Sequence, residues 1–166
     1  MAFRRIEIDI FTIHLENVEL ISLIQVKKDR FYAMTYQKGI EISFVTDFKK
    51  FEAMVDPEAL NKIISSPLIN AFKFARKKNE IRFKTDVQKL ISIAVVDDDI
   101  GIPKNQIDFI FTKFFQVNTA EHNYNNLGGS GIGLALAKSL VEKHEGSLTV
   151  ESEQNFRTTF TVLLPF

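Results

Sequence analysis

Seven residues late in the chain are rich in glycine and come directly before a segment with helical periodicity. They are residues 128–134, Gly-Gly-Ser-Gly-Ile-Gly-Leu. Glycines let a backbone approach a phosphate closely, and the free amides at a helix start favour an anion. No Lys-Ser or Lys-Thr follows the last glycine, which excludes a Walker loop. A long polar stretch precedes the segment, whereas a dinucleotide fingerprint follows the first strand of a βαβ unit. The segment alone leaves open a loop that only needs flexibility.

An aspartate ends the most apolar stretch of the chain. Residues 90–96 are nearly all apolar, and Asp97, Asp98 and Asp99 follow them. A carboxylate at the edge of a core needs a hydrogen-bond donor, and the exocyclic amine of adenine is a suitable one. A solvated, Asp-rich turn is the alternative that this stretch leaves open.

A third group of polar residues lies on a predicted helix. Ser66, Asn70 and Lys73 are spaced at i, i+4 and i+7, so they share one face, opposite the apolar face. An Asn oxygen suits a hard cation such as Mg²⁺, and a Lys suits a phosphate. Taken alone, these residues could equally form a solvated polar face.

The elements that would position these groups alternate along the chain. Alternation predicts a strand over residues 6–12, and helical spacing predicts a helix over 16–37, with Gly39 as its stop. Two strands should follow, over 40–46 and 51–55. The second helix, which carries Asn70, should begin at Asp56, with Pro57 in its first turn.

The second half of the chain repeats this alternation. Strands are predicted over residues 81–84 and 90–96. Residues 101–129 are irregular and polar apart from a short helix near 106–111, and residues 116–129 are a candidate mobile loop. A third helix is expected over 131–143, with Gly146 just past its end, before strands over 147–152 and 158–164.

The composition is that of one soluble, intracellular α/β domain. The chain has 166 residues, with 21 basic and 21 acidic side chains, so no global field favours nucleic acid or an anionic membrane. It has no cysteine and three widely separated histidines, which argues against disulfides and a zinc site. No apolar run approaches the ~20 residues of a membrane span. Charges interrupt the first thirteen residues, so they do not form a signal peptide.

Four motifs in order resemble one family of nucleotide-binding domains. Residues 68–74 resemble its asparagine box, 97–103 its first glycine box, 111–116 its phenylalanine box and 129–138 its second glycine box. This family includes the sensor histidine kinases, DNA gyrase, the Hsp90 chaperones and MutL. The resemblance runs from Asn17 nearly to the C-terminus and is closest to the histidine kinase branch. It implies an α/β two-layer sandwich, the Bergerat-type ATP-binding fold, in which a mixed sheet of about five strands has three helices packed on one face.

The resemblance also assigns roles to residues. Asn70 would bind Mg²⁺ and Lys73 the phosphates of ATP, which makes them the catalytic pair, and Asp97 would bind the adenine amine. Phe114, Phe115 and the loop to Gly128 would form a lid. The other implied nucleotide-binding residues are Phe74, Gly101, Ile102, Lys113, Phe114, Gly129, Gly131, Gly133 and Leu134. His144 would have a structural role near a helix C-terminus.

Three residues depart from the family's pattern. Ser66 stands where the family usually has a further Asn, and Pro67 where an apolar residue is usual, so the helix should kink or restart there. Asp99 stands where the family has Gly. If that turn needs a positive φ, Asp99 should weaken nucleotide binding and Asp99→Gly should relieve the defect.

The function implied is transfer of the ATP γ-phosphate to a histidine on a separate dimerisation domain. Gyrase-type relatives place a Glu general base where Ser66 stands, so a kinase is favoured over a hydrolase. His14 is followed by Leu-Glu-Asn and does not resemble the family's phosphoacceptor. The expected partners are therefore ATP or ADP, a phosphoacceptor domain and, indirectly, a response regulator, with no contact to nucleic acid or membrane by this domain. It would act in the cytoplasm, as part of a sensor that could itself be membrane-bound. Two alternatives remain open: an anti-sigma-type serine kinase, and a degenerate nucleotide- or partner-binding module without kinase activity.

Overall fold

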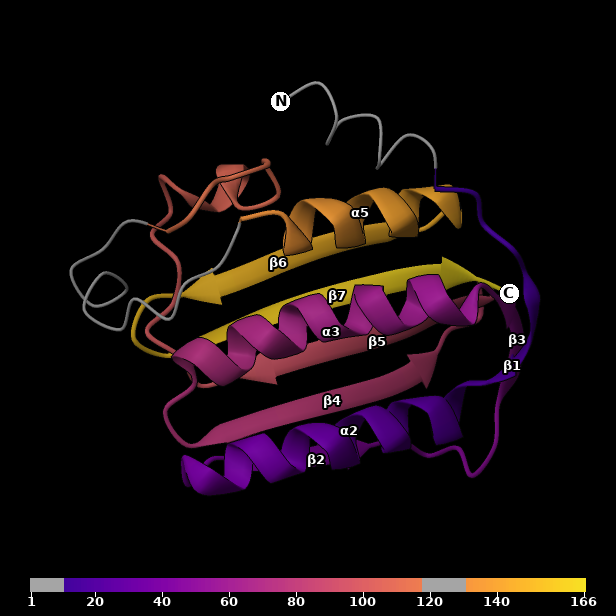
Figure 1. The fold of residues 1–166 in the computed structure, drawn as a ribbon, viewed down its shortest axis with the longest axis horizontal. Coiled ribbons are helices and arrows are strands. Elements are labelled where there is room, and N and C mark those ends of the chain that lie inside the picture. Colours follow the sequence, from indigo (N-terminus) through magenta and orange to yellow (C-terminus); the bar gives the residue numbers. More distant parts are fainter. Residues whose placement is uncertain (1–10, 118–130) are drawn as a thin grey trace.

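A mixed five-stranded sheet forms one layer of the molecule (Figure 1). The computed structural model describes residues 11–117 and 131–166. The strand order is β2-β4-β5-β7-β6, with β2 and β4 parallel and every other neighbouring pair antiparallel. The strands are β2 (Glu41–Val45), β4 (Lys78–Thr85), β5 (Leu90–Asp97), β6 (Ser147–Glu153) and β7 (Arg157–Pro165).

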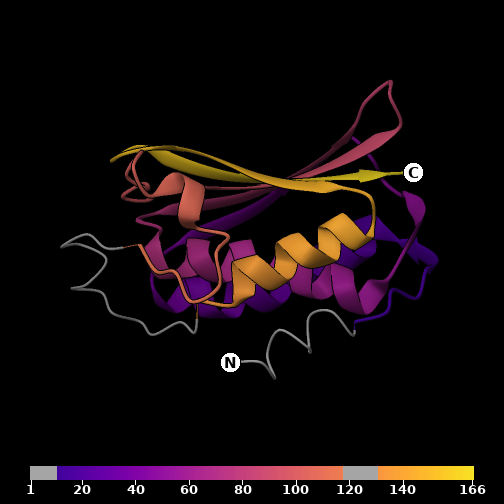
Figure 2. The same ribbon diagram turned by 90° about the horizontal axis from the view of Figure 1, so that it is seen from above.

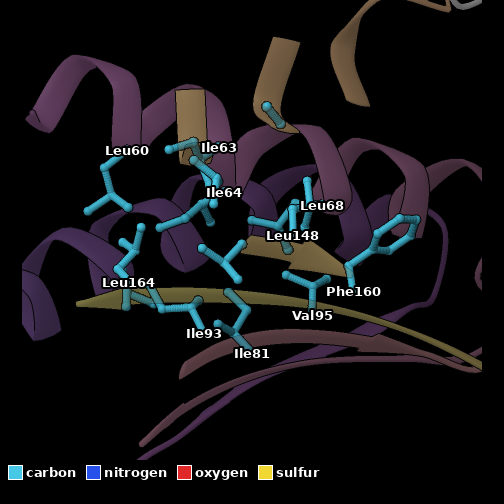
Figure 3. Close-up of a cluster of buried hydrophobic side chains, with 14 of the residues drawn as sticks. Leu60, Ile63, Ile64, Leu68, Ile81, Ile93, Val95, Leu148, Phe160 and Leu164 are labelled. Carbon is cyan, nitrogen blue, oxygen red and sulfur yellow. The ribbon is translucent and has the colours of Figure 1, made fainter. Parts of the chain in front are cut away.

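The helices form the second layer. Three α-helices occur in the described residues, α2 (Leu20–Gln37), α3 (Pro57–Phe74) and α5 (Gly133–Lys143), and all three cover the same face of the sheet (Figure 2). Ile81 and Ile93 of the sheet point toward Leu60 and Ile64 of α3, and all four are at most 1% exposed (Figure 3). The predicted sandwich, with a mixed sheet and three helices on one face, is confirmed.

Helix α3 forms for the local reasons that its sequence suggested. Asp56 is its N-cap and accepts a hydrogen bond from the Ala59 amide at 3.0 Å, and Pro57 occupies the first turn. The helix runs without interruption to Phe74, so a restart at Ser66 does not occur. The apolar face of α3 points into the core through its buried residues, which are Ala59, Leu60, Ile63, Ile64, Pro67, Leu68 and Ala71.

The predicted start of the first helix was wrong. Residues Glu16–Glu19 form a short strand, β1, which pairs antiparallel with β3 (Glu52–Val55). Helix α2 begins only at Leu20 because the Glu19 carboxylate caps it, accepting from the amides of Ile21 at 3.0 Å and Ser22 at 2.8 Å. The same carboxylate accepts from the Phe51 amide at 2.9 Å, which joins the two segments.

The remaining differences are small. The strand predicted over residues 6–12 lies mostly outside the described residues, and residues 11 and 12 belong to no helix or strand. The short helix predicted near 106–111 is a 3₁₀ turn at Ile107–Phe109. Gly39 has φ 71°, as a glycine stop after a helix should have.

Candidate nucleotide-binding site

The candidate residues of the sheet and of helix α3 meet at one end of the fold. Asp97 ends β5 and lies opposite Asn79 of β4 on one side and Thr158 of β7 on the other. Helix α3 ends at Phe74, a few residues before β4 begins at Lys78. In Figure 1 this is the left end of the sheet, where β5 and β6 finish.

Asp97 is buried and has an unused oxygen. Its side chain is 2% exposed, and its Oδ1 atom has no hydrogen-bond partner among the described residues. Burial, then the neighbouring charge and hydrogen bonding of Asp99, then the charge of Asp98, raise the pKa of Asp97 to about 9. An unpaired buried polar atom costs about 1–3 kcal/mol. A ligand N–H directed at Oδ1 would remove that cost, so the adenine amine fits the site.

Asp98 has a different partner set from its neighbour. Its carboxylate accepts hydrogen bonds from three consecutive amides, those of Arg76, Lys77 and Lys78, at 3.0–3.1 Å. It therefore holds the turn that follows helix α3 against the end of β5. These contacts explain why β4 begins at Lys78, three residues before the predicted strand.

Asp99 is an integrated part of its turn. It is 6% exposed, and its Oδ1 atom accepts from the Gly101 amide at 2.7 Å and from the Thr158 hydroxyl at 2.8 Å. The Ser152 hydroxyl, 2.7 Å from that of Thr158, accepts from the Ile102 amide at 2.8 Å. One hydrogen-bonded chain thus joins the turn to strands β6 and β7.

Asp99 does not have the positive φ on which its predicted binding defect partly depended. Among the described residues, the positive-φ positions include Gly101, at 76°, and do not include Asp99. A Cβ atom at Gly101 would lie 2.6 Å from Cα of Gln154 and 2.7 Å from O of Glu153. The strict need for glycine falls on Gly101, because both its φ and its neighbours exclude a side chain.

The polar residues of α3 lie on its half-buried side. Asn70, Lys73 and Phe74 are all partly exposed in the last turns of the helix. One turn earlier, Ser66 faces the start of helix α5, where a Cβ atom at Gly133 would lie 2.9 Å from Ser66 Oγ. The two helices therefore approach closely at Gly133, and the small residues Ser66 and Gly133 permit this approach.

The phenylalanine-rich and glycine-rich segments touch. The Phe114 amide donates to the Gly131 carbonyl at 2.8 Å, and a Cβ atom at Gly131 would lie 2.7 Å from Phe114 Cα. Phe114 itself has φ 66°, and its side chain is exposed. Ile102 is buried, Leu134 packs against the core and Lys113 is half-exposed. Gly129 and most of the predicted lid, up to Gly128, lie outside the described residues.

Residues 55–166 match the family described as "Histidine kinase-, DNA gyrase B-, and HSP90-like ATPase". The chain belongs to this ATPase family. It is 29% identical over 154 residues to the sensor histidine kinase WalK of Bacillus subtilis, covering 91% of this chain and 25% of that protein. It is 32% identical over 116 residues to the sensor protein kinase WalK of Staphylococcus epidermidis, covering 68% of this chain and 19% of the relative. The chain thus spans a quarter or less of these relatives, and it corresponds to their ATP-binding catalytic domain.

Solved structures share the fold. The crystal structure of full-length ShkA in complex with AMPPNP has a TM-score of 0.83 at 22% identity, covering 94% of this chain and 32% of that one. The mycobacterial sensor histidine kinase MprB has a TM-score of 0.75 at 23% identity, covering 92% of this chain and 97% of that one. The ATPase-family architecture therefore extends over nearly the whole chain.

The structural role predicted for His144 agrees with its contacts in this ATPase-family domain. Its Nε2 accepts from the Asp56 amide at 3.1 Å, and its Nδ1 lies 2.8 Å from the Leu140 carbonyl. The ring therefore joins the end of α5 to the cap of α3, and Nδ1 carries the proton.

Residues 11–117 and 131–166 contain neither a clustered metal site nor a membrane-spanning helix. No cluster of three or more His, Cys, Asp or Glu side chains could hold a metal ion there. Mg²⁺ usually keeps several waters and is bound by one or two protein carboxylates and by substrate phosphates, and Asn70 offers a single carboxamide oxygen in place of a carboxylate. No helix in these ranges is long and apolar enough to cross a membrane.

Proposed function

We propose that this domain binds Mg²⁺-ATP and transfers the γ-phosphoryl group to a histidine on a separate dimerisation domain. The observation that carries the proposal is the unpartnered, buried Oδ1 atom of Asp97 in a domain of this ATPase family. Kinase activity, rather than binding alone, is supported by the sensor kinases among its relatives.

The adenine end of the nucleotide would bind at the end of the sheet. Asp97 accepts the exocyclic amine, and Gly101 lets the turn pass close to neighbouring backbone. The hydrogen bonds from Asp99 to Gly101 and Thr158 hold this turn before any ligand arrives. A site fixed in advance loses less conformational entropy on binding.

The phosphate end would be held between helices α3 and α5. Within residues 11–117 and 131–166, no side chain caps the start of helix α5, so its first amides are candidates to bind an anion. Lys73 in the last turn of α3 adds positive charge, and Asn70 offers an oxygen to Mg²⁺. The metal, when bound, neutralises charge on the phosphates. Positioning and charge neutralisation supply most of phosphoryl-transfer catalysis, so the protein needs no nucleophile of its own.

The acceptor would come from a separate domain. Both ring nitrogens of His144 are engaged in the fold, and the Leu-Glu-Asn that follows His14 does not resemble the family's phosphoacceptor sequence. We therefore place the accepting histidine on a dimerisation helix, with a response regulator as the later recipient of the phosphate. This would occur in the cytoplasm.

Two measurements test the proposal. Calorimetry with ADP and with a non-hydrolysable ATP analogue, with and without Mg²⁺, should show binding that Asp97→Leu abolishes. Labelled ATP should leave the domain unlabelled but label an added dimerisation domain that bears the cognate histidine. Absence of nucleotide binding by the wild-type domain would refute the proposal.

One observation favours a second candidate, a module that binds nucleotide without transferring phosphate. Ser66 stands where the family resemblance implies a further Asn, and its short side chain lies beside Gly133. Unchanged nucleotide affinity when Mg²⁺ is removed, together with no transfer to the dimerisation domain, would support this candidate.

A further inference from the structure

We propose that Asn79 is a second base-reading residue: Asn79 Oδ1 and Asp97 Oδ1 each accept one hydrogen of the same exocyclic amine. This inference rests on the proposed nucleotide-binding function and specifies how the base is selected. No motif that pointed to the site contains Asn79.

The two residues are neighbours across the sheet. Asn79 of β4 is the register partner of Asp97 of β5. Asn79 shares its face with Ile81 and Phe83, which belong to the buried core. Asp97 likewise follows the inward-facing Val95, so both side chains point to the helical layer.

Asn79 and Asp97 also share an unpaired, buried side-chain oxygen. Each is 2% exposed, and each keeps one side-chain oxygen without a partner among the described residues. Those two atoms are the full set of such buried unpaired atoms in that part of the chain. Their occurrence side by side indicates that one ligand supplies both missing partners, since each unpaired atom costs about 1–3 kcal/mol.

The spacing suits a planar amine. Side chains directly opposite across an antiparallel pair have Cβ atoms about 4.5–5.5 Å apart. Two N–H bonds of one amine diverge by roughly 120°, so acceptors at about 2.9 Å from the nitrogen lie about 5 Å apart. A single –NH₂ group can therefore satisfy both oxygens.

The arrangement predicts a specific selectivity. Adenine carries an amine at its 6-position, whereas hypoxanthine carries a carbonyl oxygen there. That oxygen would face two acceptors and leave both unsatisfied, and sites built for a donor reject analogues that lack it. A methyl group on the amine would remove one of the two N–H donors.

The test is a cycle of ligand and protein changes, measured by calorimetry in the absence of kinase turnover. The ligands are ADP, N6-methyl-ADP and inosine diphosphate. The variants are Asn79→Leu, which keeps the size but removes the acceptor, and Lys84→Gln, an exposed change on the same strand, as the control. Thermal unfolding of each free protein accompanies the titrations.

We expect Asn79→Leu to weaken ADP binding about tenfold and to raise the unfolding temperature of the free protein, since it removes an unpaired polar atom. Lys84→Gln should change neither quantity. N6-methylation should weaken binding to the wild type about tenfold, but to Asn79→Leu by about twofold or less. Should Asn79→Leu fail to fold, Asn79→Ala carries the same expectations for the ligands.

Three results would overturn the inference. They are unchanged ADP affinity in Asn79→Leu, an equal methylation penalty in both proteins, and inosine diphosphate bound as tightly as ADP. If ADP binding depends on Asp97 and not on Asn79, this inference fails and the proposed function stands. If the wild-type domain binds no nucleotide, both fail.

Discussion

Replacing Asp97 by Asn should stabilise the free protein at alkaline pH while weakening nucleotide binding. The carboxyl of Asp97 is 2% exposed, and burial beside Asp99 raises its pKa to about 9, from 3.8 in the unfolded chain. Between these two values the folded protein binds a proton that the unfolded chain releases. The free energy of unfolding therefore falls as the pH rises from about 4 to about 9.

The change in the free energy of unfolding per pH unit sets the size of the stability difference between the wild type and Asp97→Asn. One proton of difference changes the free energy of unfolding by up to about 1.4 kcal/mol per pH unit. Between pH 6 and pH 8 the wild type should therefore lose about 1–3 kcal/mol relative to Asp97→Asn, whose amide does not titrate. Below pH 4 both forms carry a neutral group at this position, so the difference should vanish.

Urea unfolding at several pH values measures this difference, and calorimetry measures the effect on ADP. Above about pH 9, where Asp97 is ionised in the free protein, a neutral amide accepts a hydrogen bond less strongly than the carboxylate, so ADP binding should weaken by about 1.5–3 kcal/mol. Lys84→Gln again serves as the control. A stability difference that stays constant from pH 4 to pH 9 would contradict the assignment of a raised pKa to Asp97.

Three further substitutions test the supports of the site and of helix α2. Asp99→Gly should lower the free energy of unfolding by about 2–4 kcal/mol and weaken ADP binding, because two hydrogen bonds to a buried carboxylate are lost. Tighter ADP binding in this variant would show that these two hydrogen bonds do not shape the site. Gly101→Ala should cost more than about 2 kcal/mol or prevent folding, as its Cβ would meet the Gln154 backbone at 2.6 Å, and a normal melting curve would refute this. Glu19→Gln should cost about 1 kcal/mol at pH 7. Burial raises the pKa of Glu19, but hydrogen bonds from Phe51, Ser22 and Ile21 outweigh burial and hold that pKa at about 2. The cost of Glu19→Gln should therefore disappear as the pH falls from about 4.5 to about 2 in acid unfolding experiments.

The elements that sequence predicted well are those whose signals are local. Helix α3 has its cap at Asp56, its proline at Pro57 and its buried face all within its own residues. Strand β5 could also be predicted from its own residues, because its nearly continuous apolar run is typical of a strand buried at the centre of a sheet, which is where β5 lies. Both elements carry candidate site residues, Asn70 and Asp97, whose roles came from the family resemblance.

The elements that sequence missed depend on distant partners. Strand β1 forms because Glu16–Glu19 pairs with β3, some 36 residues further along, since Glu16 lies opposite Val55 and Glu19 opposite Glu52. Glu19 also reaches the Phe51 amide, a contact that no periodicity could reveal. Asn79 follows three basic residues and lies just before the strand predicted over residues 81–84, so it was not assigned to a strand. Extending the alternation of Ile81 and Phe83 backward by one step would have placed it on the buried face.

Three consecutive aspartates show why residue type alone could not assign the site. Asp97 turns into the core with an oxygen that has no partner among the described residues, Asp98 holds the turn after α3, and Asp99 joins its own turn to β7. Successive side chains at the end of a strand point to opposite faces, so adjacent carboxylates meet different partners. Asp99 therefore has two opposing effects on the site. Its hydrogen bonds fix the turn, and its charge raises the pKa of Asp97. In Asp99→Gly the pH dependence of stability should accordingly weaken even as the turn loosens, and that combination separates the electrostatic role of Asp99 from its structural one.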